Sequence, residues 1–321
     1  MILRSMDKRV GARFCTGFLL ALLFLSLPAC KRKGPAVAGP TSGQSTFASP
    51  EEAGKALMDA ARDDNQQQLL AIFGADSKDV IFSGNAANDK SAFAQFASAY
   101  ARMNRWRQLE NGSQILLVGV SNTAFPIPVR KDSSGKWFFD TPAGQNELIN
   151  RDIGRNELAN VDVCSMLRIA QLEYFDQEHE GQKQYAPRFI STPGKQDGLY
   201  WPEQPGKPKS PIGPLIAYAT VEGGKLQASL HKPFYGYYYG ILFTQGPFAS
   251  GGLRDYTRSG VMSRGFGFIA YPAKYGVTGV MTFIINQDGI VYQKDMGANT
   301  DDEAPFMRMF NPDGSWSEVK E

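Results

Sequence analysis

The stretch LANVDVCSMLRIAQLEYF, residues 158–175, decides the architecture of the second half of this chain. At about 100° per residue around a helix, its apolar side chains fall on two opposite sides. The two sides carry, respectively, Val161, Ile169 and Leu172, and Val163, Leu167, Ala170 and Tyr174. Because a helix that is apolar all round is buried on both sides, the pattern predicts a central helix that also touches a second surface.

The chain after this helix changes first to turns and then to strands. Residues 185–214 are rich in Pro and Gly, which predicts a long irregular region. Strand-like segments follow at residues 235–244, 265–271, 280–285 and 290–294. The last two are joined by Asn286-Gln-Asp-Gly289, which is typical of a hairpin turn. We therefore expect a domain over residues 143–321, in which the helix packs on an antiparallel four-stranded meander.

Residues 47–142 predict a small domain of helices followed by an antiparallel sheet. Ser49-Pro50-Glu51-Glu52 is typical of a helix start, with Ser49 as N-cap and Glu52 completing a capping box. Further helices are expected at residues 66–73 and 90–103, and strands at residues 114–120, 125–130 and 136–139. This order resembles the cystatin-like or nuclear-transport-factor-like cones of exported bacterial proteins. The fold class expected for the whole chain is α+β.

Residues 1–29 resemble a signal peptide. Basic residues ending at Arg13 precede an apolar run at residues 18–27, which is shorter than the roughly 20 residues that a bilayer core requires. The run ends at Leu27-Pro-Ala-Cys30, which resembles the bacterial lipobox, where Cys30 becomes the lipidated first residue. Residues 30–46, rich in Gly, Pro and Ser, predict a lipidated tether. The alternative is a plain secretory signal cut at a nearby small residue.

The predicted location is the cell envelope. Several acyl chains on Cys30 would anchor the exported protein to a membrane. Lys31, where an aspartate would retain a Gram-negative lipoprotein, resembles the sorting pattern for the periplasmic face of the outer membrane. The whole chain carries 34 basic and 32 acidic residues, a net charge of +2. The signal segment holds four basic residues and one acidic residue, so the mature chain is near 2 − 3 = −1, and nucleic acid is not an expected partner.

Few residues carry recognisable chemistry. Without Cys15 and Cys30, only Cys164 remains, so no intrachain disulfide is expected, and its apolar surroundings favour a buried cysteine. His179 and His231 lack partners at metal-ligand spacing, so we expect no metal and no cofactor. No nucleophile signature is present, and no catalytic residue is assigned. A pair of carboxylates needs only proximity in space, so enzymatic activity is left open.

An aromatic cluster is the predicted ligand site. Tyr237 and Tyr239 share one face of the expected strand at residues 235–244, and glycines on the other face leave room for something close. Tyr200 and Trp201 lie in the proline-rich loop. Aromatic rings with a polar end suit wet binding sites, so these four residues are expected to stack on a glycan or peptide. The alternative is a core in which the hydroxyl groups reach the rim.

Long motifs carry a family resemblance. They are Arg151-Asp-Ile-Gly-Arg-Asn-Glu-Leu158, Tyr185-Ala-Pro-Arg-Phe189, Ser191-Thr-Pro-Gly-Lys-Gln-Asp-Gly-Leu-Tyr-Trp-Pro202, Tyr237-Tyr-Tyr239 and the run at residues 275–295. Together they resemble the uncharacterised bacterial domain-of-unknown-function family 2950 over most of residues 47–302, a family that brings no established activity. The helix and the last hairpin also resemble the globular part of pilins and pseudopilins. Gly17 is followed by Phe18, and Leu22 stands where a prepilin has its glutamate, so the resemblance implies a pilin-shaped domain and not a polymerising pilin.

The combined expectation is a cell-envelope lipoprotein that acts as a binding or assembly module for an envelope protein or a glycan. One alternative is a hydrolase of envelope glycan or peptide. Another is a carrier that holds a small apolar ligand in the domain at residues 47–142.

Overall fold

The computed structural model describes residues 39–179, 181–206, 208–220 and 232–320. The predicted signal peptide, the lipidation site Cys30 and the first part of the tether lie outside these residues, as does His231. The chain divides into two compact units, Met1–Leu148 and Ile149–Glu321, whereas the sequence placed the boundary between residues 142 and 143. The division falls inside helix α5 (Thr141–Phe175), which begins in the first unit and continues into the second.

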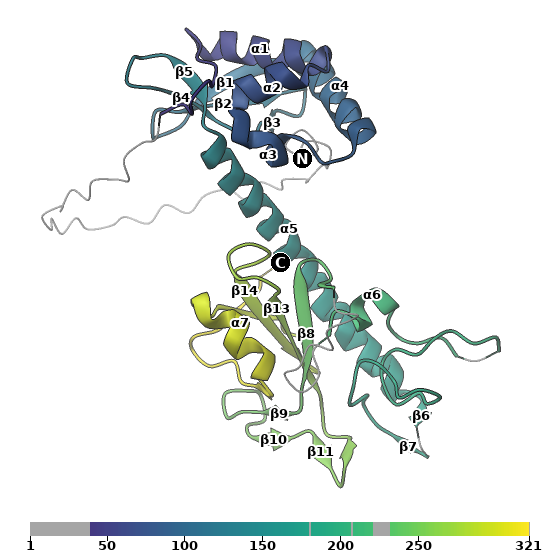
Figure 1. Ribbon diagram of the computed structural model, residues 1–321. Coiled ribbons are helices and arrows are strands. Elements are labelled where there is room, and N and C mark those ends of the chain that lie inside the picture. The colour runs from purple at the N-terminus through teal and green to yellow at the C-terminus, as the bar shows by residue number, and fades with distance from the viewer. Residues whose placement is uncertain (1–38, 180, 207, 221–231, 321) are drawn as a thin grey trace, which may run out of the picture. The chain divides into compact units, whose positions relative to one another are not determined.

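The first unit consists of helices packed on a five-stranded sheet with the order β1-β2-β4-β5, in which β3 pairs with β2 (Figure 1). Its helical elements are α1 (Pro50–Arg62), α2 (Gln66–Phe73), η2 (Ala75–Ser77), α3 (Lys78–Ile81) and α4 (Ala86–Arg102). Its strands are β1 (Asn104–Gln108), β2 (Gln114–Val118), β3 (Thr123–Ala124), β4 (Val129–Lys131) and β5 (Trp137–Phe139). The predicted N-cap is confirmed, because Ser49 Oγ accepts from the Glu52 amide at 3.1 Å, whereas Glu52 Oε2 accepts at 2.8 Å from the amide of Ala48, one residue before the N-cap, and not from Ser49 as in a standard capping box.

The ordered part of the first unit begins earlier than expected. Gln44 was placed in the tether, but its Nε2 donates to the carbonyls of Ile72 and Phe139 at 3.1 and 2.8 Å. The Ser45 amide donates to the Ala71 carbonyl at 2.8 Å. The end of the expected tether is therefore part of the folded body, because it supplies donors to the carbonyls at the end of α2 and of β5.

The second unit is built on the sheet β17-β15-β14-β13-β8. The strands are β8 (Tyr237–Leu242), β13 (Gly267–Pro272), β14 (Met281–Asn286), β15 (Tyr292–Asp295) and β17 (Ser317–Glu318). All neighbours pair antiparallel, with Ile269 opposite both Gly240 and Ile284. The predicted four-stranded meander is confirmed, and β17 adds a fifth strand at its edge.

Short elements surround this sheet. They are β6 (Glu178–His179), β7 (Gln182–Lys183), α6 (Pro214–Ala217), β9 (Thr244–Gln245), β10 (Arg254–Asp255), β11 (Thr257–Arg258), β12 (Val261–Met262), η3 (Gly297–Asn299), α7 (Thr300–Glu303), η4 (Ala304–Phe306) and β16 (Met309–Phe310). Figure 1 shows α5 and α7 on opposite sides of the sheet. The α5 side holds the larger core, which includes Leu167 and Phe268, and the other side holds Ile269, Tyr271 and Phe310. The helices and the largely antiparallel sheets give the expected α+β class.

Helix α5 is buried on one side only in the second unit. Val163, Leu167 and Tyr174 face the sheet with at most 1 % of their surface exposed. On the opposite side Ile169 is 51 % exposed, whereas Val161 and Leu172 are half-buried against the same core, so the predicted burial on both sides is wrong at Ile169. The reason is that the sheet of this unit covers a single face of the helix. In the described ranges, no helix combines the length and apolarity needed to cross a membrane.

Candidate functional site

Tyr237 and Tyr239, two of the four residues expected to bind a ligand, lie in the core of the second unit with no exposed surface. The Tyr237 hydroxyl donates to the Met281 carbonyl at 2.8 Å, and the Tyr239 hydroxyl donates to Asn160 Oδ1. Burial raises the pKa of both hydroxyl groups. The predicted exposed stacking surface is therefore wrong for these residues, because α5 covers the face of β8 that carries them.

The other two predicted residues belong to the same core. Trp201 is 6 % exposed, and its Nε1 donates to the Pro208 carbonyl at 2.9 Å. Tyr200 is half-buried, packs against this core, and meets the Tyr218 ring edge-on with 5.8 Å between ring centroids. The four residues thus join one hydrophobic core, as the alternative held, and they do not line a common groove.

Polar residues on the inner side of α5 hold the sheet to the helix. Glu157 Oε1 accepts from the amides of Val280 and Met281 at 2.9 and 3.0 Å. Asn156 Nδ2 donates to the Thr278 carbonyl at 2.9 Å. Asn160, fully buried, donates through Nδ2 to the Tyr235 carbonyl at 3.1 Å and to Asn156 O at 2.8 Å. The motif at residues 151–158 therefore supplies structural contacts, which sequence reasoning did not assign.

Two glycines allow this close contact. A Cβ on Gly236, whose φ is +72°, would lie 2.6 Å from Asn156 Nδ2. A Cβ on Gly279 would overlap the Tyr237 hydroxyl. Since atoms cannot approach so closely, these positions require glycine as long as the helix and sheet stay in register.

Cys164 and His179, the described cysteine and histidine of the second unit, are both held in its interior. Cys164 is fully buried, and burial raises the pKa of its thiol to about 12, so it stays protonated and unreactive near neutral pH. The His179 ring stacks on the Tyr174 ring at 3.6 Å, and its Nε2 lies 3.0 Å from the Tyr174 carbonyl. Among the residues that the structure describes, no three His, Cys, Asp or Glu side chains gather as metal ligands.

A hollow of about 320 Å³ beside β6 brings His179, Glu178 and Asp197 together. Asp197 is bound to its own loop, since Oδ1 accepts from the Thr192 amide at 2.7 Å and Oδ2 from the Thr192 hydroxyl at 2.8 Å. Burial raises the pKa of this carboxyl group, but these hydrogen bonds and the charge of Arg188 outweigh it, and the net pKa is lowered. The carboxylate stays ionised and holds the loop.

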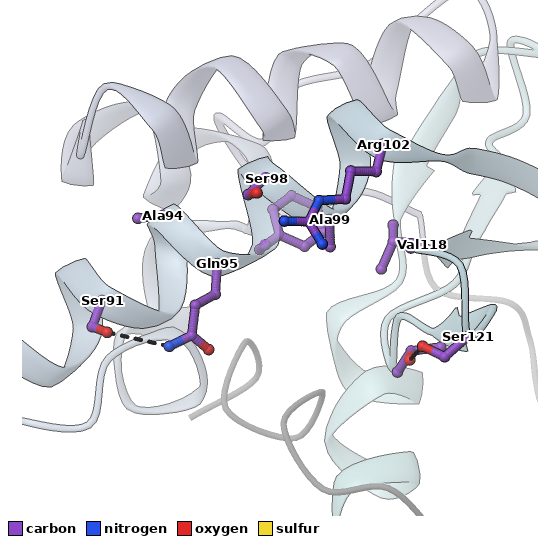
Figure 2. A pocket seen from close by; sticks show the side chains of 11 residues that line it. Ser91, Ala94, Gln95, Ser98, Ala99, Arg102, Val118 and Ser121 are labelled. Carbon is purple, nitrogen blue, oxygen red and sulfur yellow. Dashed lines mark hydrogen bonds between the residues drawn. The ribbon is translucent and has the colours of Figure 1, made fainter.

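A second hollow, of about 570 Å³, lies in the first unit on the outer side of α4 and beside the turn after β2 (Figure 2). Its lining mixes polar residues with apolar ones such as Phe96 and Val118; Ser91 and Gln95 are hydrogen-bonded at 3.3 Å, and Arg102 is the one charged residue among the described residues that line it. The interior of this unit is filled by aromatic rings, with Phe96 and Phe125 at 5.5 Å between centroids. The carrier hypothesis for this unit stays a prediction.

The outer side of α5 in the second unit is the remaining surface of interest. We call it the outer stripe, and it consists of Leu158, Val161, Asp162, Ser165, Arg168, Ile169 and Leu172. Leu158 is 68 % exposed and Ile169, about three turns further along the same face, is 51 % exposed. Val161 and Leu172 lie between and beyond them on this face, half-buried against the core of the unit. Next to the stripe lies a groove of about 690 Å³, bounded by Leu158–Ser165 on one side and by residues 289–291 and 318–320 on the other. The stripe and this groove form the candidate functional site.

The site was only half visible in the sequence. The apolar residues of the stripe follow helical spacing, and they raised the expectation of a second contact. The other wall of the groove comes from Gly289–Val291 and from the C-terminal strand, more than a hundred residues away in sequence. No pattern within one segment could reveal that they meet.

Comparison with known proteins identifies the family of this chain. No curated protein and no solved structure matches the chain, so the likeness to pilins and to nuclear-transport-factor-like cones stays a prediction. A family model described as Protein of unknown function (DUF2950) matches residues 44–319, which span both units. The chain therefore belongs to the DUF2950 family.

Proposed function

We propose that this protein is a cell-envelope lipoprotein that acts as a binding or assembly module, with the outer stripe of α5 as its binding surface. The observation that carries the proposal is that two exposed apolar side chains, Leu158 and Ile169, share one face of α5 beside an open groove. A contiguous apolar patch on a folded unit marks an interaction surface, because leaving it in water costs free energy that a partner would recover.

The anchor in this proposal is Cys30. The apolar run at residues 18–27 followed by Leu27-Pro-Ala-Cys30 supports export and acylation, and Lys31 supports the periplasmic face of the outer membrane. Two or more acyl chains hold a protein to a bilayer stably, whereas one does not. A lipid-anchored body then meets its partners within the envelope.

Binding is favoured over hydrolysis by the state of the polar groups. The Asp197 carboxylate is held by Thr192, the Cys164 thiol is buried, and the His179 ring is stacked. A hydrolase needs an acid and a base that can reach a substrate. The outer stripe, by contrast, presents the exposed side chains of Leu158 and Ile169 beside an open groove.

Two measurements test the proposal. Cys30→Ala should abolish acylation, detected by mass spectrometry of the mature protein, and should move the protein out of the membrane fraction. An unlipidated wild type, or a Cys30→Ala variant that stays with the membrane, would show that the anchor is wrong.

The binding surface is tested by cysteine labelling in isolated envelopes. Ser165→Cys in the stripe is compared with Ser263→Cys, a matched exposed serine of the same unit outside the stripe. We expect a membrane-impermeant maleimide in opened envelopes to label the Ser263→Cys thiol readily and the Ser165→Cys thiol several-fold more slowly. Equal labelling rates would mean that nothing covers the stripe.

A further inference from the structure

We infer that the outer stripe binds the same stripe of a second copy of this chain, with the two α5 helices antiparallel and crossing at Ser165. The inference rests on the proposed function and names the partner for that surface. Such an interface is isologous: Ser165 lies on the two-fold axis and meets Ser165 of the other copy, whereas every other residue of the stripe meets a different residue, and those contacts occur twice.

The order of residues along the stripe supports an antiparallel pair. Leu158 and Leu172 lie seven positions before and after Ser165, and Val161 and Ile169 lie four positions before and after it. When a second copy runs in the opposite direction through Ser165, Leu158 therefore meets Leu172 of the other copy. Val161 meets Ile169 in the same way. Each apolar pair thus joins one exposed residue, Leu158 or Ile169, to one half-buried residue of the other copy, Leu172 or Val161.

The charges of the stripe are complementary in this arrangement. Asp162 and Arg168 lie three positions before and after Ser165, so each aspartate faces the arginine of the other copy. Asp162 is exposed. Arg168 Nε donates to the Gln287 carbonyl at 3.0 Å, which holds the guanidinium group near the groove. A parallel pair would instead set like charges against each other, so the charges select the antiparallel orientation.

The small residue at the centre allows the helices to come close. Ser165 is exposed, and its hydroxyl bonds back to the Val161 carbonyl at 3.3 Å, so no long side chain stands at the crossing point. From Leu158 to Leu172 the stripe is about 21 Å long at 1.5 Å per residue. Such a short interface lies at the weak end of specific complexes. Anchoring both copies to one membrane raises their effective concentration and favours the pair.

Disulfide formation tests the crossing point and the register. Because Cys164 is buried, Ser165→Cys adds the single accessible thiol within the described residues, and mild oxidation of envelopes should give a product of twice the chain mass. Ser263→Cys is the control and should stay monomeric. Co-expressed Leu158→Cys and Leu172→Cys chains with different tags should cross-link to each other, whereas Leu158→Cys alone should not, because its two thiols would lie far beyond disulfide reach.

Charge reversal tests the paired ions in the purified full-length mature protein by sedimentation equilibrium. Asp162→Lys should weaken self-association by about tenfold or more, because two ion pairs become two like-charge pairs. Adding Arg168→Glu to the same chain restores opposite charges across the interface and should recover most of the affinity. The far-ultraviolet circular dichroism spectrum of each variant confirms that α5 is intact.

Three results would overturn the inference: a wild type that stays monomeric at all concentrations, an Asp162→Lys variant that associates as tightly as wild type, or a Ser165→Cys product of any mass other than twice the chain. The last would mean that another protein covers the stripe.

These outcomes can be distinguished from a failure of the proposed function. If the protein is monomeric but its Ser165→Cys thiol is protected in envelopes, the stripe still binds a partner, and only the inference that this partner is a second copy is wrong. If the protein forms the dimer but carries no acyl chain, only the predicted lipid anchor at Cys30 is wrong.

Discussion

Tyr239→Phe removes one buried hydroxyl group and leaves the aromatic ring, so it tests whether Tyr239 is a core residue. The hydroxyl donates to Asn160 Oδ1, and the Phe234 carbonyl lies 3.1 Å away. Without it, the buried Asn160 oxygen loses its donor, which costs about 1–3 kcal/mol of unfolding free energy. Tyr239→Ala also removes a ring with no exposed surface, and should cost about 3–5 kcal/mol, as other buried aromatic residues do.

The measurement is urea denaturation of the full mature chain, followed by circular dichroism, with thermal unfolding as a second observable. At about 2–4 °C per kcal/mol for a unit of this size, Tyr239→Phe should lower the Tm by about 2–12 °C. Tyr235→Phe is the matched control, because Tyr235 is 52 % exposed and should change stability by less than about 0.5 kcal/mol. If Tyr239→Ala unfolds like wild type, the ring is not in the core and the reasoning fails.

Three further predictions concern the same unit. Leu167→Ala on the sheet side of α5 should cost about 2–5 kcal/mol in urea denaturation, and Met166→Ala on the exposed side less than about 0.5 kcal/mol; equal costs would contradict the one-sided burial. The pKa of Asp197 is lowered in the folded protein, so its carboxylate stabilises the fold above the ordinary pKa of about 3.9, and this contribution is lost as pH falls through the lower folded pKa. Asp197→Asn should therefore have a lower unfolding free energy than wild type at pH 7, and the difference should vanish in acid. A difference in unfolding free energy that does not change with pH would contradict the role of the ionised carboxylate. Gly279→Ala should cost about 1–3 kcal/mol because its methyl group overlaps the Tyr237 hydroxyl and ring edge, and combining it with Tyr237→Ala, which removes that ring, should cost less than the sum of the two single changes.

Local patterns determined the elements and the fold class. The N-cap at Ser49 defines the start of α1 because its side chain satisfies an amide that a helix leaves unpaired. The turn at residues 286–289 joins β14 to β15 because its residues suit a reversal of the chain. Strand β1 was missed, since its sequence NRWRQ is mostly polar and lies at the edge of a sheet, where exposed residues need no alternation.

Only the tertiary structure decided which faces are covered. The alternation along β8 places Tyr237 and Tyr239 on one face and Tyr238 on the other. The same alternation would occur whether Tyr237 and Tyr239 faced solvent or a helix. Packing of α5 on that face turned an expected binding surface into core. In the same way, the apolar residues on both sides of α5 predicted that the helix packs against two surfaces, and the sheet of the second unit provides one of them. The outer stripe is left exposed because a single sheet covers only one side of a helix, and the groove beside it exists only where Leu158–Ser165 meets segments distant in sequence.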